Sequence, residues 1–273
     1  MADKVRIASL QQLKAESKKI VMVTAYDYPT GRLADEAGVD VVHVGDSLAN
    51  ILGYGDEIPV TLDDMIHHTA AVRRGVKRAL LMADMPFMTY KVSPEEALRN
   101  AARLVQQGGA EVVKMEGGCE ICPTIRKVAQ AGIAVMGHIG VMPQSVHAQS
   151  GYKVRGKEAD ETERLIEDAL AIEEAGCFAI VLEVVGWDSA RRITEALRVP
   201  TIGIGSGAEC DGQIMVMVEL IGLSFRQQPR YVKRYSEAGD AIRGAVESFA
   251  REVRSGAYPD RQHAYLAREK KEE

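Results

Sequence analysis

Short apolar runs recur along the chain, and each of them stops at a polar residue. A loop follows each run, and a stretch with helical spacing usually comes next. The runs are "KIVMVTAYD" (19–27), "DVVHVGD" (40–46), "ALLMAD" (79–84), "EVVKME" (111–116), "IAVMGH" (133–138), "AIVLE" (179–183), "PTIGIGS" (200–206) and "QIMVMVE" (213–219). Near-continuous runs of Val, Ile, Leu and Met are typical of parallel strands that are covered on both faces. The pattern therefore predicts eight parallel strands.

Two of the intervening segments carry clear helix boundaries. "SPEEALRNAARLVQQGG" has Ser93 as an N-cap, Pro94 at the first helical position and a closing glycine. "DETERLIEDALAIEEAG" also ends on a glycine, Gly176. Strands that alternate with helices in this way predict an α/β fold, the (β/α)8 TIM barrel.

Two segments depart from the regular alternation of strands and helices. Residues 5–18 have the spacing of an amphipathic helix, which we expect to close the floor of the barrel. Only "GAECDG" separates the seventh and eighth runs, which is too short for a helix, so the seventh unit should be irregular. A doubly wound open sheet is the alternative, but no G-x-G-x-x-G opens any of the helices.

The composition is that of a globular protein that binds neither nucleic acid nor an anionic membrane. The 273 residues are 46% hydrophobic, and the net charge of −5 gives no basic surface for nucleic acid or an anionic membrane. No linker divides the chain, so we expect a single barrel domain over residues 1–273 with a short charged tail, "LAREKKEE". The first residues lack the apolar centre of a signal peptide and no apolar run reaches 18 residues, so we expect a cytoplasmic protein.

Acidic residues end several of the predicted strands. The carboxyl ends of all barrel strands open onto one face, where loops build the active site. A single strand-end Asp often only caps the next helix or turn. Asp46, Asp84 and Glu116, however, end three consecutive strands and would repel one another in a partly dry cavity. Mg²⁺ accepts carboxylates and water as ligands, so the three acids predict a metal site.

Two further charged residues are candidates for chemistry at the same mouth. Lys114 lies two residues before Glu116 and therefore faces the same side of its strand. It is either a buried ion-pair partner of the acids or a cationic contact for an anionic substrate. Glu183 ends the sixth run, across the mouth from the metal acids, where a carboxylate can serve as a general base.

The cysteines give little evidence for a site. Cys119 and Cys122 form one C-x-x-C, without a second pair or a nearby histidine. We interpret them as ordinary thiols of a reducing compartment rather than as zinc ligands or a redox pair.

Several motifs resemble the ketopantoate hydroxymethyltransferase family. The similar blocks include "TAYDYPTGRLADEAGVD", "VGDSLA", "PVTLDDMIHHTAAVRRG", "ADMPFMTY", "VKMEGG", "GHIGVMPQSVHAQSGYKVRGK" and "ITEALRVPTIGIGSG", and they occur in family order. The resemblance implies an enzyme of pantothenate biosynthesis that needs Mg²⁺. Such an enzyme transfers a one-carbon unit from 5,10-methylenetetrahydrofolate to 3-methyl-2-oxobutanoate and gives 2-dehydropantoate. It also implies a homo-oligomer, often a decamer in bacterial members.

The resemblance also implies roles for individual residues. Asp46, Asp84 and Glu116 would surround the metal. Asp46, Ser47, Asp84 and Lys114 would contact the oxo acid. No residue pattern indicates where the folate binds.

The resemblance also implies which residue is the catalytic base, and it shows two positions at which this chain differs from the family. By the resemblance, Glu183 would accept the proton, whereas the role of His138, which matches a family histidine, stays open. Val218 and Glu219, predicted to end the eighth strand, stand where family members commonly carry His-Asp, so that support from this strand is expected to be weaker.

Two other functions are alternatives. One is a Mg²⁺-dependent C–C lyase or mutase of the isocitrate lyase group, whose barrels carry similar "GDS" loops. Those lyases commonly use a cysteine in a lysine-rich loop, and no such loop surrounds a cysteine here. The other is a catalytically impaired barrel that acts as a binding protein.

Overall fold

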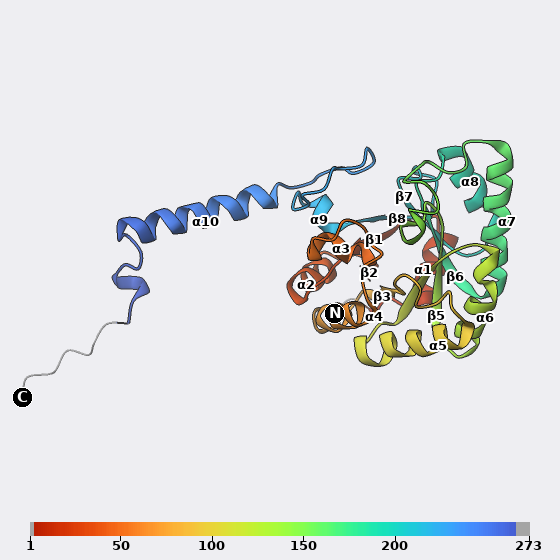
Figure 1. Cartoon of the computed structure of the whole chain (residues 1–273), viewed down its shortest axis with the longest axis horizontal. Helices are drawn as coiled ribbons and strands as arrows, with labels where there is room; N and C mark the ends of the chain where they lie inside the picture. The colour runs from red at the N-terminus through yellow and green to blue at the C-terminus, as the bar shows by residue number, and fades with distance from the viewer. Residues whose placement is uncertain (1–2, 266–273) are drawn as a thin grey trace, which may run out of the picture. The chain divides into compact units, whose positions relative to one another are not determined.

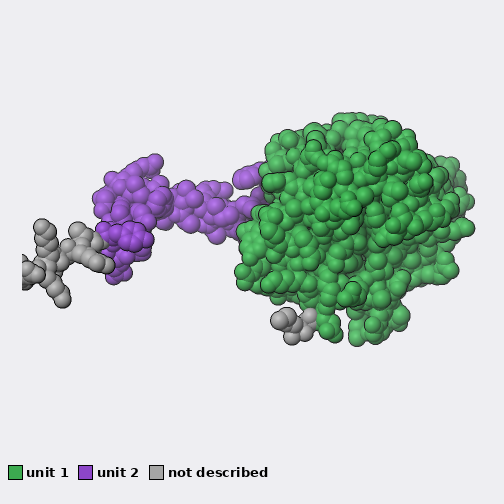
Figure 2. All heavy atoms as spheres, turned by 90° about the horizontal axis from the view of Figure 1, so that it is seen from below, with its two compact units in different colours: residues 1–217, 226–232 green, residues 218–225, 233–273 purple. Residues whose placement is uncertain are grey.

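A computed structural model describes residues 3–265 of the chain (Figure 1). The charged segment "LAREKKEE" lies outside the described residues. The chain divides into two compact units, residues 1–217 with 226–232 and residues 218–225 with 233–273 (Figure 2). All eight strands belong to the first unit.

The strands form one closed parallel barrel in sequence order, which confirms the predicted TIM barrel. They are β1 (Ile20–Thr24), β2 (Val41–Val44), β3 (Leu80–Asp84), β4 (Val112–Glu116), β5 (Ala134–Gly140), β6 (Cys177–Glu183), β7 (Thr201–Ile204) and β8 (Gly212–Met215). β1 pairs with β8 and closes the ring.

Helices follow most strands and cover the outside of the barrel (Figure 1). The helices of this layer are α2 (Tyr28–Glu36), α3 (Ala49–Leu52), α4 (Leu62–Gly75), α5 (Pro94–Arg103), α6 (Cys122–Gln130), α7 (Ala159–Ala175) and α8 (Trp187–Ala196). Short helical turns are η1 (Asp46–Leu48), η2 (Leu104–Gly108), η3 (Cys119–Ile121) and η4 (Pro143–Ser145). Ser93 caps α5 as predicted, because its hydroxyl accepts the Glu96 N–H at 3.2 Å.

The barrel interior changes from apolar to polar along each strand. On β4, Val112 belongs to the apolar core, whereas Lys114 and Glu116 follow it on the same inward face. On β3, Met82 is a core residue and Asp84 is the next inward position. The apolar interior therefore ends one layer below the carboxyl ends of the strands, and the charged side chains are buried at the mouth.

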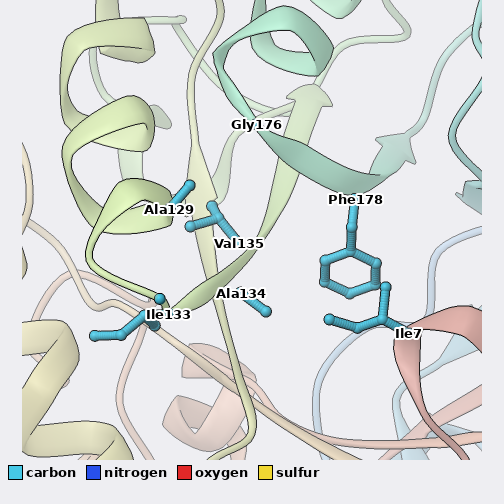
Figure 3. A pocket seen from close by; sticks show the side chains of 8 residues that line it. Ile7, Ala129, Ile133, Ala134, Val135, Gly176 and Phe178 are labelled. Atoms are coloured by element: carbon cyan, nitrogen blue, oxygen red, sulfur yellow. The ribbon is translucent and has the colours of Figure 1, made fainter.

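The amino-terminal helix closes the other end of the barrel. Leu10 of α1 (Ile7–Ala15) is fully buried in the core cluster. The Lys4 ammonium donates to the carbonyl of Ala79 at 2.6 Å, just before β3 begins. An open pocket of about 250 Å³ lies beside α1, and its lining includes Ile7 and Phe178 (Figure 3). It lies at the amino ends of β5 and β6, away from the acidic mouth.

The end of the barrel differs in part from the sequence prediction. No helix separates β7 from β8, so the seventh unit is irregular as predicted. The eighth run is not a strand to residue 219, because β8 ends at Met215 and the chain turns into the short helix α9 (Met217–Leu220). The prediction that Val218 and Glu219 end the eighth strand is therefore wrong.

The second unit contains the rest of α9, the long helix α10 (Ala238–Ser255) and the turn η5 (Arg261–His263). Apolar side chains at Ile242, Val246, Phe249 and Val253 form one stripe of α10, and all four are exposed. Within residues 3–265, no helix is both long and apolar enough to span a membrane.

Candidate active site

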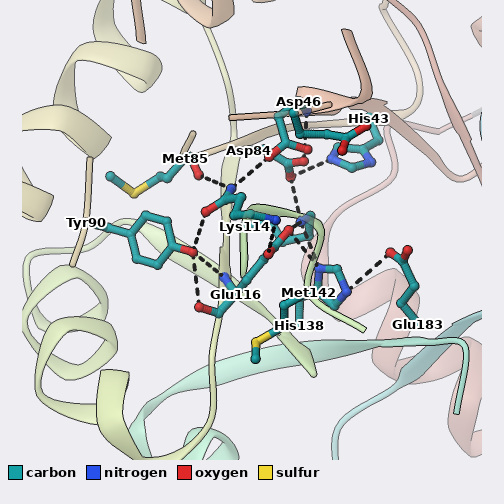
Figure 4. Close-up of polar contacts among 12 residues, drawn as sticks. His43, Asp46, Asp84, Met85, Tyr90, Lys114, Glu116, His138, Met142 and Glu183 are labelled. Atoms are coloured by element: carbon teal, nitrogen blue, oxygen red, sulfur yellow. Dashed lines mark hydrogen bonds and ion pairs between the residues drawn. The ribbon is translucent and has the colours of Figure 1, made fainter. Parts of the chain in front are cut away.

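Three acidic side chains converge at the mouth from β3, β4 and the turn after β2. Asp84 and Glu116 occupy the last positions of their strands, and Asp46 is the first residue of η1. All three are almost fully buried, with exposed fractions of 2%, 1% and 4%. The structure therefore brings together the three residues that the sequence predicts as metal ligands (Figure 4).

A close backbone approach joins Asp46 to Asp84. The Asp46 N–H donates to Oδ2 of Asp84 at 3.1 Å, and Nε2 of His43 lies 2.7 Å from Oδ1 of the same carboxylate. A Cβ at Gly45 would lie 2.8 Å from the Ser47 hydroxyl oxygen and 3.1 Å from the His43 ring. A larger residue at position 45 would therefore displace the side chains of Ser47 and His43.

Lys114 lies among the acids. Its Nζ is 3.1 Å from Oδ1 of Asp84 and 3.8 Å from Oε1 of Glu116. It also lies 3.1 Å from Nδ1 of His138, and an ammonium group can only donate in that contact. In this tautomer, Nε2 of His138 carries the hydrogen.

His138 links this cluster to Glu183. Its Nδ1 lies 3.5 Å from Oε1 of Glu116, and its Nε2 lies 3.4 Å from Oε2 of Glu183. Glu183 is paired with Gly140 in the register of β5 and β6, and a Cβ at Gly140 would collide with the Glu183 carbonyl oxygen. Glu183 thus faces the acids through one imidazole ring (Figure 4).

Gln144 and Tyr90 form a buried polar network beneath the acids. Gln144 Nε2 donates to Oδ2 of Asp46 at 2.8 Å and to the carbonyl of Met85 at 2.9 Å. The Tyr90 hydroxyl lies 2.8 Å from Oε1 of Gln144 and 3.1 Å from both the N–H and the carbonyl of Glu116.

Burial and neighbouring charges move the pKa values of this cluster apart. Burial raises the pKa of Asp46, and Asp84 and Glu116 raise it further. Burial also raises the pKa of Glu116, although His138 and Lys114 oppose this. Burial acts in the same direction on Asp84, but His43 and Lys114 outweigh it and hold the pKa of that carboxyl below its usual range.

The lysine has the opposite balance. Burial lowers the pKa of Lys114, but the attraction of Asp84, Glu116 and Asp46 is stronger, and the net pKa is raised. Lys114 therefore stays charged. One ammonium group faces three carboxyl groups, which leaves the mouth acidic.

Other strand-end residues do not join this cluster. Asp27 caps α2, since its carboxylate accepts the Thr30 N–H at 2.7 Å. The Ser206 hydroxyl donates to the carbonyl of Leu182 at 2.7 Å and accepts the Val185 N–H at 3.0 Å. Ser47 stays at the mouth, where its hydroxyl lies 2.8 Å from that of Tyr26.

Over residues 3–265, no three His, Cys, Asp or Glu side chains converge closely enough to coordinate one ion by themselves. The Lys114 ammonium contacts both Asp84 and Glu116 in this arrangement. Mg²⁺ is usually held by one or two carboxylates together with water and substrate, so it does not require three converging side chains.

The C-x-x-C pair has no feature of an activated thiol. Cys119 is exposed in η3, and Cys122 begins α6. The Asp168 carboxylate beside Cys119 raises the pKa of that thiol to about 11. Since the thiolate is the reactive form, a raised pKa does not support nucleophilic or redox chemistry there.

Three residues of the site have no role that could be predicted from the sequence, namely His43, Tyr90 and Gln144. His43 was detectable, because it is a single polar residue in an otherwise apolar run. Gln144 stands in "GHIGVMPQS", but its contacts depend on the path of the loop after β5. Tyr90 lies in the loop after β3 and carries no signal in the local pattern.

Comparison with known proteins gives a consistent family. Residues 4–261 match the family model described as ketopantoate hydroxymethyltransferase. A relative from Moorella thermoacetica is 49% identical over 96% of this chain and 98% of its own length. One from Chloroflexus aurantiacus is 50% identical over 96% of this chain and 92% of its own. Both relatives are named 3-methyl-2-oxobutanoate hydroxymethyltransferase.

Solved structures share the fold at low sequence identity. A phosphonopyruvate hydrolase in complex with oxalate and Mg²⁺ has a TM-score of 0.62 at 15% identity, covering 94% of this chain and 92% of that one. A 2,3-dimethylmalate lyase, a member of the PEP mutase/isocitrate lyase superfamily, has a TM-score of 0.59 at 19% identity, covering 94% and 91%. At these identities the likeness shows the fold alone.

Proposed function

Since the chain belongs to the ketopantoate hydroxymethyltransferase family, we propose that its acidic mouth transfers a hydroxymethyl group to 3-methyl-2-oxobutanoate. The one-carbon donor in this proposal is 5,10-methylenetetrahydrofolate, and the product is 2-dehydropantoate. The observation that carries it is the buried set of Asp46, Asp84, Glu116 and Lys114, with Glu183 facing it through His138.

The residues of the mouth fit a hard divalent cation. All the acidic donors are carboxylate oxygens, which suit Mg²⁺. Oε1 of Glu116 is buried and has no hydrogen-bond partner within the described part of the chain. Burial and mutual repulsion also raise the pKa of Asp46, so a bound cation would relieve an existing cost. We therefore propose that Asp46, Asp84 and Glu116 surround Mg²⁺, with one or two of them as direct ligands and with water and substrate completing the set.

The ammonium group among the acids suits an anionic substrate such as a 2-oxo acid. Mg²⁺, when bound, would withdraw electron density from the keto oxygen and so make the hydrogen on C3 more acidic. Asp46, Ser47, Asp84 and Lys114 would contact the substrate, and the Lys114 ammonium would balance its carboxylate.

Glu183 would remove the proton from C3. Its carboxylate lies on the far side of His138 from the metal acids, and its side chain is 16% exposed. The C3 carbanion then forms a bond to the methylene carbon of the folate, and water supplies the hydroxyl group as tetrahydrofolate leaves. Nε2 of His138 lies 3.4 Å from Oε2 of Glu183 without a hydrogen bond to any described residue, so the ring faces that carboxylate.

A homo-oligomer is part of the same proposal, with a decamer as the expectation from the family. The exposed stripe Ile242, Val246, Phe249 and Val253 supports it, because contiguous apolar surface of this kind is usually covered by a partner. Light scattering should give a mass several times that of one chain, and Phe249→Glu should lower it. Arg251→Glu, on an exposed position of the same helix, should not.

Turnover with both substrates tests the proposed function. Purified protein with Mg²⁺, methylenetetrahydrofolate and 3-methyl-2-oxobutanoate should form 2-dehydropantoate, identified by mass spectrometry. Folate-independent cleavage of a C–C bond would instead indicate the lyase alternative. Binding of the oxo acid without turnover or C3 exchange would indicate the binding protein.

A cytoplasmic location completes the proposal and rests on the family resemblance.

A further inference from the structure

Gln144 is the one residue of the described chain that hydrogen-bonds to both Asp46 and Glu116, and it uses two different groups to do so. Its side-chain Nε2 donates to Oδ2 of Asp46 at 2.8 Å. Its backbone N–H donates to Oε2 of Glu116 at 3.2 Å. It is 98 residues from Asp46 and 28 from Glu116 in the sequence, so only the fold brings these groups together.

The orientation of the Gln144 amide is set by its surroundings. The Met85 carbonyl can only accept, so the group that faces it at 2.9 Å must be the NH₂. The two hydrogens of Nε2 are then directed to Met85 and Asp46. At the other end, the Tyr90 hydroxyl lies 2.8 Å from Oε1 and is fully buried. A flipped amide would face Met85 with a second acceptor, which is strongly unfavourable in a buried site.

These contacts hold one oxygen of each acid by a hydrogen bond and leave one oxygen of Glu116 without one. Oδ2 of Asp46 and Oε2 of Glu116 are the held atoms. Oε1 of Glu116 has no hydrogen bond from any residue between 3 and 265. The acids therefore need little rearrangement to accept a cation, and the entropy of fixing their side chains has been lost on folding.

We infer that Gln144 is a positioning residue, which fixes Asp46 and Glu116 in the orientation that receives the divalent cation. The inference rests on the proposed function. Hydrogen-bond partners behind metal-binding carboxylates typically contribute 10–100-fold in metal affinity. Gln144 would act through the acids and would not touch the reacting carbon.

The test is Mn²⁺ binding to the full chain without substrate, measured from the electron paramagnetic resonance signal of free Mn²⁺. Gln144→Met has a similar length but no amide, and it should weaken Mn²⁺ binding by about 10–100-fold. Gln149→Met is the matched control, because Gln149 lies on the same loop but accepts only the Met142 N–H, at 3.4 Å. It should bind Mn²⁺ as the natural chain does.

A structural defect must be distinguished from lost positioning. Circular dichroism checks the fold of each variant, and Gln144→Asn replaces Gln144→Met if the latter does not fold. Asn keeps the amide but is shorter by one methylene, so it should also bind Mn²⁺ more weakly. A positioning role further predicts that saturating Mn²⁺ restores most of the turnover of either variant. Natural-like Mn²⁺ affinity in a folded Gln144 variant would overturn this inference alone, whereas failure of the natural chain to bind Mn²⁺ would overturn the cation assignment with it.

Discussion

The ammonium nitrogen of Lys114 lies 3.1 Å from Oδ1 of Asp84, and the two residues are direct neighbours in the register of β4 and β3. Both side chains are buried, with exposed fractions of 5% and 3%. The pair forms where the inward faces of two adjacent strands pass from apolar to charged. Lys114 thus belongs to the framework of the acidic mouth as well as being a candidate contact for the substrate.

Removal of this ammonium should destabilise the protein. Lys114→Met leaves buried carboxylates without their cation, and breaking a buried pair in this way costs about 3–5 kcal/mol. Urea unfolding at pH 8 with a chelator measures the loss. Lys153→Met changes an exposed lysine and should stay within about 0.5 kcal/mol of the natural chain. Equal stability of the two variants would show that the acids are compensated in another way.

The acidic mouth could be predicted from the sequence because it depends on two regular features. Period-two alternation places Lys114 and Glu116 on one face, and parallel strands in a barrel bring their carboxyl ends together. Asp84 and Glu116 therefore follow from local pattern and fold class. His43 obeys the same rule, since it shares the inward face of β2 with Val41.

The remaining residues of the site lie in loops, and no local sequence pattern predicts the course of these loops. Gln144 and Tyr90 reach the acids from loops. Gln144 is 54 positions from Tyr90 and 98 positions from Asp46 in the sequence, and it contacts both. The prediction of a strand over the whole eighth run was wrong for a different reason. A short apolar run is compatible with a strand or a helix, and "IMVMVEL" contains the end of β8 and the start of α9.

Asp35 should make stability depend on pH at a place remote from the mouth. Its carboxylate accepts the N–H groups of Lys77, Arg78 and Ala79 at 3.0, 3.0 and 2.6 Å. Burial raises the pKa of Asp35, but these backbone donors outweigh it and lower the net value. A lowered folded-state pKa contributes stability above the unfolded-state pKa of about 3.9, and this is lost as the pH falls through the folded-state pKa.

Asp35→Asn should therefore be less stable than the natural chain by about 1–3 kcal/mol at pH 7, and the difference should shrink below about pH 4. Chemical unfolding between pH 7 and 3 measures it. Glu36→Gln is the control on the same helix, because Glu36 is half exposed and pairs only with Arg32. A difference for Asp35→Asn that does not change with pH would argue against stabilisation by the ionised carboxylate.

Asp84 should be required for cation binding. Asp84→Asn removes a proposed ligand and also weakens the contacts to His43 and Lys114. We expect Mn²⁺ affinity to fall by more than about 100-fold, beyond the range expected for residues behind the ligands. Metal-dependent turnover should be lost with it. Asp63→Asn changes an exposed acid paired with Arg103 and should leave both unchanged. Full turnover of Asp84→Asn in the presence of a chelator would refute the metal assignment.

Glu183 should be required for proton removal even when no folate is present. The natural chain with Mg²⁺ should exchange the C3 hydrogen of 3-methyl-2-oxobutanoate for deuterium in D₂O, which proton NMR follows directly. Glu183→Gln keeps the size of the side chain but cannot accept the proton, so exchange should fall by about 10²–10⁴-fold. Mn²⁺ affinity should change little, because Glu183 reaches the metal acids only through His138.

Glu195→Gln, an exposed position on α8, is the control and should exchange at the natural rate. Exchange that persists in Glu183→Gln would move the role of the base to His138, whose Nε2 lies 3.4 Å from the Glu183 carboxylate. His138→Gln in the same experiment then decides between the two residues. Loss of exchange in the His138 variant alone would assign the base to His138, whereas loss in Glu183→Gln alone would leave the base at Glu183 and give His138 no part in proton removal.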